Sequence, residues 1–310
     1  MSPVPNPSFV RDWPRPLGFV FSGGGAYGSV HVGMMKAMSE LGICPDIVVG
    51  TSVGSLNGAM LASHPTDAHD RLSDLWALMS RKTVIGHGPI SATLNLLRTG
   101  SLSTSNAMST VIAEQLDHHN IEQLPLTFAA VATEAISGQP TMLRSGPIQP
   151  ALLASSALPG VFPPVEIDGH SYLDGGLSAN VPVHQTIQLG ARSVVAFDAS
   201  PAGRSELPST PFHRFVHTMV TLVRNQSAHA IDALDGETPV LLMPRVTPPD
   251  MGAFNFRHTQ WLIDAAYEVA MQTINGDTPE PPALDRGKPR RLHTLSRPIL
   301  RPLIGRKSVA

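Results

Sequence analysis

Two glycine-rich segments, each placed between an apolar run and a helix-like pattern, constrain this chain more than any other feature. They are residues 19–28, which contain Gly23-Gly24-Gly25-Ala26-Tyr27-Gly28, and residues 48–54. A buried strand that turns through glycines into a helix is the repeating unit of parallel α/β sheets. We therefore expect the two corners to lie side by side, with the rest of the chain organised around them.

The apolar pattern predicts an α/β fold. Residues 17–21 and 46–50 are short apolar runs typical of buried strands, and residues 30–41 and 55–62 carry apolar side chains at helical spacing. This alternation favours a parallel sheet covered on both faces. Further strands are predicted at 126–133, 141–144, 193–198 and 239–243, with a hairpin at 165–173. Further helices are predicted at 67–79, 92–97, 106–116, 150–157, 183–189, 212–234 and 260–274.

Composition restricts the class of protein. The chain has 310 residues, of which 42% are hydrophobic and 15% charged, so it can bury a large core. A formal net charge of -2 gives no reason to expect a nucleic-acid partner. The single cysteine, Cys44, excludes an intramolecular disulfide framework and a cysteine-rich metal site. We predict neither a metal nor a cofactor.

The two ends of the chain differ from its middle. We expect residues 1–16 to form a Pro-rich, irregular arm, residues 17–275 a single folded domain, and residues 276–310 a Pro- and Arg-rich tail. Prolines occupy the place of a signal-peptide core, and no window reaches about 18 uninterrupted apolar residues, so a cytoplasmic location is the expectation. Two interpretations of the basic tail stay open, namely a solvated disordered segment and an attachment to anionic membrane.

Residues 50–54, Gly-Thr-Ser-Val-Gly, fit the pattern G-x-S-x-G. The glycines Gly50 and Gly54 permit a sharp turn from strand to helix, which exposes Ser52 at the helix N-terminus. The positive end of the helix dipole favours negative charge that develops there. The required context of a strand before and a helix after is present, so Ser52 is the candidate nucleophile.

The first corner admits two uses. Gly23, Gly25 and Gly28 fit the dinucleotide fingerprint G-x-G-x-x-G, but that use needs an acidic residue at the end of the next strand. Asp46 stands at the beginning of that strand, so a nucleotide cofactor is disfavoured. Backbone N–H groups at a helix start also bind an oxyanion. We therefore expect an oxyanion hole at Gly24, Gly25 and Ala26.

A serine nucleophile needs a base. Asp174, followed by Gly175 and Gly176, comes after a predicted strand, and the glycines leave its carboxylate accessible. Asp198, at the end of another strand, is the rival acid. A histidine triad would need a late, loop-borne histidine, and none of the candidates has that context; they are His184, His213, His217, His229, His258 and His293.

These motifs, in this order, resemble the patatin-like phospholipase family. Residues 23–28 match its oxyanion motif, residues 50–54 its nucleophile elbow and residues 174–176 its Asp-Gly-Gly motif, while residues 154–164 resemble the segment before the aspartate. The resemblance covers roughly residues 17–200. It implies a three-layer α/β/α fold with a mainly parallel sheet, a Ser-Asp dyad of Ser52 and Asp174 without histidine, and hydrolysis of acyl esters in lipids.

One position departs from that family's pattern. The family often has Arg or Lys just before the last glycine of the first motif, where this chain has Tyr27. The missing charge would alter the preference for phosphate-bearing head groups, unless Tyr27 is only a packing residue. We expect residues 83–102 and methionine-rich helices to line the acyl site, although methionines such as Met34, Met35, Met38 and Met60 more often belong to a core.

Two other functions stay open at this point. One is a Ser-His-Asp esterase that acts on small soluble esters. The other is a non-catalytic protein that binds an anion or lipid at the glycine corner. Acyl transfer to another lipid, in place of water, is a variant of the leading hypothesis.

Overall fold

A computed structural model describes most of residues 10–281. The described stretches are residues 12–78, 115–200, 238–246 and 255–281, with residue 10 and scattered positions from 210 to 225. The predicted acyl-site segment at 83–102 lies outside the described residues. So do nearly all of the predicted helix at 106–116, most of the one at 212–234, and residues 282–310 of the basic tail.

A mixed, mainly parallel sheet forms the middle of the molecule. Its order is β5-β6-β3-β2-β1-β7-β8, and β4 also pairs with β3. The parallel strands are β1 (Leu17–Phe21), β2 (Ile47–Thr51), β3 (Thr127–Glu134), β7 (Ser193–Phe197) and β8 (Val240–Leu242). The antiparallel strands are β4 (Pro140–Leu143), β5 (Val165–Ile167) and β6 (His170–Asp174). The predicted strands are confirmed, with bounds shifted by a residue or two.

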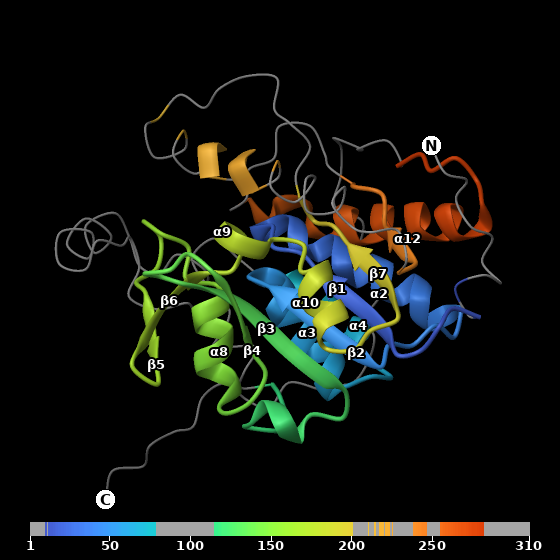
Figure 1. The fold of residues 1–310 in the computed structure, drawn as a ribbon. Helices are drawn as coiled ribbons and strands as arrows, with labels where there is room; N and C mark the ends of the chain where they lie inside the picture. Colours follow the sequence, from blue (N-terminus) through green and yellow to red (C-terminus); the bar gives the residue numbers. More distant parts are fainter. Residues whose placement is uncertain are drawn as a thin grey trace, which may run out of the picture.

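Helices cover both faces of this sheet. Alternate residues of a strand point to opposite faces, so Phe19 and Phe21 join one core cluster and Val20 joins another. The Phe19 face packs against α2 (Val30–Glu40), α3 (Val53–Ser63), α4 (Ala68–Leu78), α8 (Ile148–Ser155) and α12 (Thr259–Asn275). The opposite face carries α10 (Val183–Gln188), in front of β1 in Figure 1. The predicted three-layer α/β/α fold is confirmed.

Short elements complete the frame of the site. The predicted hairpin turn consists of Asp168 and Gly169, which adopt left-handed φ values of 51° and 79° between β5 and β6. The 3-10 helix η1 (Gly25–Ser29) leads into α2, and α9 (Gly176–Ala179) follows β6. Two further 3-10 helices are η2 (Ile121–Gln123) and η3 (Phe256–His258). No helix in the described stretches is long and apolar enough to cross a membrane.

Strand register brings the chemically interesting segments to one edge of the sheet. In the parallel pair of β1 and β2, Phe21 is aligned with Gly50, so both glycine corners follow at the carboxyl end of the strands. The antiparallel pair of β3 and β6 aligns Ala132 with Asp174. The acidic residue therefore reaches the same edge from a strand that runs in the opposite direction.

Candidate active site

Ser52 forms a sharp corner between β2 and α3. Its φ of 54° and ψ of -127° are unusual for a residue with a side chain. The neighbouring glycines allow two close backbone approaches. A Cβ at Gly50 would collide with the backbone of Gly54, and a Cβ at Gly54 would collide with the carbonyl of Phe21. The G-x-S-x-G pattern thus has the strand-to-helix geometry that the sequence predicts.

Asp174, the last residue of β6, contacts Ser52 in the structure. The Ser52 hydroxyl donates a hydrogen bond of 2.7 Å to Asp174 Oδ2, although the residues are 122 positions apart. The other carboxylate oxygen, Oδ1, accepts the Gly176 N–H at 2.8 Å. Asp174 is 5% exposed. Each oxygen of the Asp174 carboxylate therefore accepts a hydrogen bond, which fixes the orientation of the carboxylate relative to Ser52.

Burial changes the acidity of this carboxyl group. Loss of solvation raises the pKa of Asp174 from 3.8 to about 6, and the hydrogen bonds from Ser52 and Gly176 oppose that rise. A carboxylate with this pKa is a better proton acceptor than an ordinary aspartate and is still ionised near pH 7. The site therefore places a serine hydroxyl in direct contact with a carboxylate of raised pKa.

The C-terminal turn of α8 contacts both members of the pair. Ser155 Oγ accepts the backbone N–H of Ser52 at 2.9 Å and donates to the Val131 carbonyl at 2.6 Å. The N–H of Asp174 donates to the Ala157 carbonyl at 2.9 Å, and the N–H of Gly175 donates to the Ser155 carbonyl at 3.1 Å. Sequence reasoning assigned no role to Ser155, because its only signal was its place in the segment before the aspartate.

The first glycine corner lies against Ser52. A Cβ at Gly23 would lie 3.3 Å from the Cβ of Ser52 and 2.5 Å from Asn180 Oδ1. Gly24 is the N-cap of η1, and Gly25 and Ala26 begin its first turn, where N–H groups have no acceptor within the helix. Gly25 adopts a left-handed φ of 59°. The start of η1 thus follows directly after the glycine that approaches Ser52.

A buried polar cluster binds the last glycine of this corner, Gly28. Asn57 Nδ2 donates to the Gly28 carbonyl at 2.9 Å and lies 3.1 Å from His31 Nδ1, and Trp76 Nε1 donates to Asn57 Oδ1 at 3.2 Å. Burial lowers the pKa of His31 to about 4, so the ring is neutral near pH 7. Its Nδ1 then accepts from Asn57, which places its proton on Nε2.

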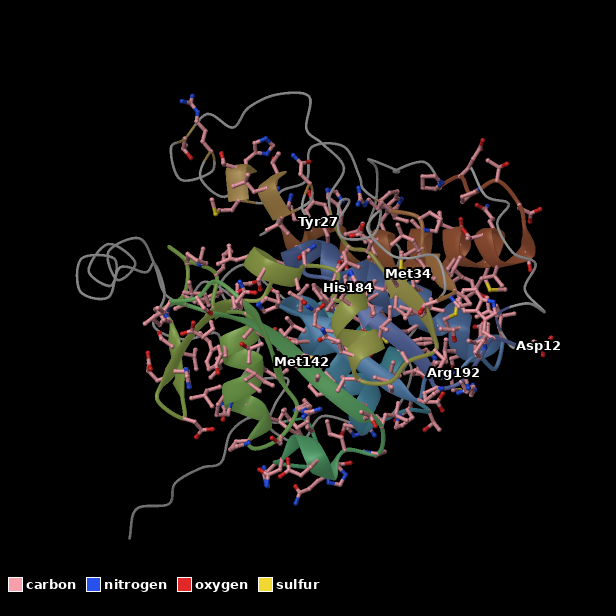
Figure 2. All side chains as sticks on the ribbon, viewed as in Figure 1. Asp12, Tyr27, Met34, Met142, His184 and Arg192 are labelled. Atoms are coloured by element: carbon pink, nitrogen blue, oxygen red, sulfur yellow. The ribbon has the colours of Figure 1, made fainter. Side chains whose placement is uncertain are left out.

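The rival candidates lie elsewhere. The Asp198 carboxylate accepts the Ser200 N–H at 2.8 Å and Arg245 Nε at 2.6 Å, and so has partners other than Ser52. His184, labelled in Figure 2, is exposed on α10. No histidine of the described stretches is hydrogen-bonded to Ser52 or Asp174, and His213, His229 and His293 lie outside them.

Two sequence questions are answered by burial. Tyr27 is 3% exposed and belongs to the main core cluster, as a packing residue does. The methionines Met34, Met35, Met38 and Met60 are also core residues, and Figure 2 labels Met34.

Asp46 binds Arg15 and the Leu17 N–H at the opposite end of the sheet, which agrees with its exclusion as a ribose ligand. In the described part of the chain, no group of three potential metal ligands gathers.

Comparison with protein families gives one match over more than half of the chain. The model of the family described as "Patatin-like phospholipase" matches residues 19–187. This range includes both glycine corners, Ser52, Asp174 and the α8 segment. The match agrees with the resemblance that the motifs indicate.

Curated relatives carry related names. "Patatin-like phospholipase domain-containing protein ZK370.4" from Caenorhabditis elegans is 33% identical over 202 residues, 62% of this chain and 14% of the relative. "Patatin-like phospholipase domain-containing protein 6" from Homo sapiens is 29% identical over 194 residues, 62% and 14% of the two chains. "Lysophospholipase NTE1" from Mycosarcoma maydis is 29% identical over 191 residues, 59% and 10%. The chain thus spans 10–14% of the length of these relatives.

Solved structures are more distant. VipD from Legionella pneumophila aligns over 84% of this chain and 67% of its own, with a TM-score of 0.46 and 15% identity. ExoU, in its complex with SpcU from Pseudomonas aeruginosa, aligns over 84% and 51%, with a TM-score of 0.40 and 17% identity.

Proposed function

The chain belongs to the patatin-like phospholipase family, and we propose that it is a lipid acyl hydrolase that cleaves carboxylic esters with a Ser52–Asp174 dyad. The observation that carries this proposal is the 2.7 Å hydrogen bond from the Ser52 hydroxyl to a buried carboxylate, beside amides at a helix start. A phospholipid or a related lipid is the proposed substrate, because of the family and because one relative is named a lysophospholipase.

The first half of the proposed reaction forms an acyl-enzyme. Ser52 Oγ attacks the ester carbonyl while Asp174 Oδ2 accepts the hydroxyl proton. The carbonyl oxygen becomes an oxyanion, which the N–H groups of Gly24, Gly25 and Ala26 stabilise by hydrogen bonds. Collapse of this intermediate breaks the ester bond. Asp174 returns the proton to the departing alcohol, such as a glycerol hydroxyl of the lipid.

The second half releases the fatty acid. Asp174 accepts a proton from water, and the hydroxide equivalent attacks the Ser52 ester. The same amides hold the second oxyanion, and its collapse returns the proton to Ser52 Oγ. No histidine is needed in this scheme, because burial has already raised the basicity of the carboxylate. If a lipid alcohol replaced water in this step, the same site would transfer the acyl group.

A peripheral contact with an anionic membrane, through the basic tail from residue 276, is a second part of the proposal. It is supported only by eight Lys and Arg residues after position 285 in the sequence. Each basic residue near an anionic surface contributes about 1 kcal/mol and is weakened by salt. Binding to anionic vesicles that survives removal of residues 282–310 would contradict this part.

The test of the dyad compares wild type with Ser52→Ala and Asp174→Asn on phospholipid, lysophospholipid, triacylglycerol and a small soluble ester. Both variants are expected to release fatty acid at least ~10²-fold more slowly, while both stay folded. Ser63→Ala, in the helix α3 that follows Ser52, is the matched control, because the buried Ser63 hydroxyl has no hydrogen-bond partner among the described residues.

The outcomes separate the alternatives. Loss of release in Ser52→Ala but not in Asp174→Asn would point to another base, and a histidine whose replacement by Ala abolished activity would support a triad. Full activity of Ser52→Ala in ligand binding, with no labelling of wild type by a fluorophosphonate, would favour a non-catalytic anion- or lipid-binding protein.

A further inference from the structure

A second serine shares the backbone of the nucleophile corner. Ser155, the last residue of α8, is fully buried, and its hydroxyl lies between the Ser52 N–H and the Val131 carbonyl. Because the Ser52 N–H must donate, Ser155 Oγ is the acceptor there, and its own proton is directed to Val131. The direction of both hydrogen bonds is therefore determined, and a single hydroxyl links β3 to the corner after β2.

We propose that Ser155 is a positioning residue for the esterase reaction, and that its hydroxyl holds the backbone of Ser52 in the conformation that aims Oγ at Asp174. This inference rests on the proposed function of the Ser52–Asp174 pair. Ser155 does not touch the reacting atoms, since its hydroxyl contacts are made with backbone groups.

The backbone of Ser52 needs such support. Its φ of 54° and ψ of -127° are unfavourable for a residue with a side chain, and such conformations persist only where the surroundings impose them. The hydrogen bond from the Ser52 N–H acts on the residue that carries this strain. Without the Ser155 hydroxyl, that N–H would lose its partner in a part-buried site, and the corner would be free to relax.

The end of α8 and the residues just after it also bind the backbone of the proposed base. The N–H of Asp174 is bound by the Ala157 carbonyl at 2.9 Å, and the N–H of Gly175 by the Ser155 carbonyl at 3.1 Å. The backbones of Ser52 and Asp174 are thus hydrogen-bonded to residues at or just after one helix end, although they follow or end strands on either side of β3. The end of α8 therefore sets the distance between them, and Ser155 supplies the part of this contact that a side-chain substitution can remove.

The Ser155 contact also has a consequence for the oxyanion. Because the Ser52 N–H is already bound to Ser155, it is not available to the oxyanion, and the proposed donors of the first glycine corner do not depend on this contact. A substitution at Ser155 should therefore change the approach of Oγ without removing an oxyanion donor. Its effect should fall on kcat and on the reactivity of Ser52, and much less on KM.

The acid limb of the pH profile supplies a second signature. The hydrogen bond from Ser52 lowers the pKa of Asp174 against the larger effect of burial. If Ser52 Oγ is no longer held against Asp174, this lowering is weakened and the pKa rises. A change that merely reduced the amount of folded protein would leave that limb in place.

The experiment compares Ser155→Ala with Ser155→Thr, which keeps a hydroxyl, and Ser155→Cys, which keeps the size but is a weak donor and acceptor. Ser156→Ala is the matched control, because Ser156 is the next residue, is 6% exposed, and its hydroxyl has no hydrogen-bond partner in the described part of the chain. Active sites are titrated with a fluorophosphonate, and kcat is expressed per titrated site.

We expect Ser155→Ala and Ser155→Cys to lower kcat and the fluorophosphonate labelling rate by about 10- to 100-fold, with KM within about threefold of wild type. Their acid limbs should shift to higher pH, Ser155→Thr should recover most of the loss, and Ser156→Ala should match wild type. If Ser155→Ala does not fold, Ser155→Cys gives the same comparison in a side chain of similar volume.

The positioning role would be overturned if Ser155→Ala or Ser155→Cys had the kcat per titrated site, the labelling rate and the acid limb of the wild type. So would equal losses in Ser155→Cys and Ser156→Ala. Failure of the proposed function is distinguishable, because then the wild type itself would neither label at Ser52 nor release fatty acid.

Discussion

Asp174 meets two opposing requirements at the scale of a single residue. Its burial disfavours the charged form, which raises its pKa to about 6, while the Ser52 hydroxyl and the Gly176 N–H stabilise the charge that remains. The result is a carboxylate that is more basic than an ordinary aspartate and is still ionised at neutral pH, as the proposed base must be. This balance has measurable consequences for activity and for stability.

The first consequence is a pH dependence of hydrolysis. The base must be ionised, so kcat/KM should be constant above pH 7 and should fall about tenfold per pH unit below about pH 6. Initial rates on a soluble ester, which avoid changes in lipid packing, measure this limb. A profile that stays flat down to about pH 4.5, near the ordinary pKa of a carboxylate, would argue against Asp174 as the base.

The second consequence concerns the free energy of unfolding. The pKa of Asp174 is higher in the folded protein than its ordinary value of 3.8, so the folded state binds more protons between pH 4 and 6, and its stability falls as the pH rises through that window. Asp174→Asn removes this ionisation. The variant should be more stable than wild type at about pH 8, by on the order of 2 kcal/mol, and similar to it near pH 4.

Urea unfolding of both proteins at the two pH values measures the difference. Asp264→Asn, on the exposed surface of α12, is the control, and should change stability little at either pH. A gain in Asp174→Asn that does not depend on pH would show that the buried charge is not its cause.

At the scale of elements, three helices depend on one buried amide. Asn57 in α3 binds the Gly28 carbonyl of η1, the ring of His31 in α2 and the indole N–H of Trp76 in α4. An Asn side chain supplies two donors and an acceptor, and this geometry uses all three. The amide therefore connects the helix layer directly to the corner that carries the proposed oxyanion donors.

We expect Asn57→Ala to lower the free energy of unfolding by roughly 2–4 kcal/mol, because several buried polar groups lose partners and a small cavity forms. Denaturant unfolding measures this cost. Ser63→Ala in the same helix is the control, since the buried Ser63 hydroxyl has no hydrogen-bond partner among the residues that the structure describes. A loss in Asn57→Ala no larger than that of the control would contradict the bridging role.

At the scale of the whole molecule, one ion pair connects segments 47 residues apart. Arg245, just after β8, binds Asp198, just after β7, with Nε 2.6 Å from Oδ2. The Asp198 side chain is fully buried, whereas that of Arg245 is 33% exposed. The pair joins the edge strand β8 to the part of the sheet that contains the site.

Removal of one partner would leave a buried charge without its counterion. We expect Arg245→Met to destabilise the fold by roughly 2–4 kcal/mol, and the double variant Asp198→Asn/Arg245→Met to recover part of that loss. Thermal or urea unfolding of the two single variants and the double variant measures the coupling. Additive losses in the double variant would contradict an ion pair that stabilises the molecule.

Local sequence patterns determined the elements and the candidate chemistry. In the described stretches, apolar runs and helical spacing predicted the strands and the longer helices to within a residue or two, because these patterns reflect which side of each element is buried. The glycines of both corners predicted turns that a side chain would obstruct. Ser52 was identifiable from the second corner, and Asp174 from the two glycines that follow it. Asp168 and Gly169 likewise predicted the hairpin that the structure contains.

Tertiary structure alone decided which distant residues meet. The 2.7 Å contact of Ser52 with Asp174 depends on the register of β2, β3 and β6, and on the end of α8 that binds both backbones. The raised pKa of Asp174 depends on burial by residues far away in the chain. No local pattern marks Ser155 or Asn57 either, because a buried hydroxyl or amide acquires its role from the partners that packing brings to it.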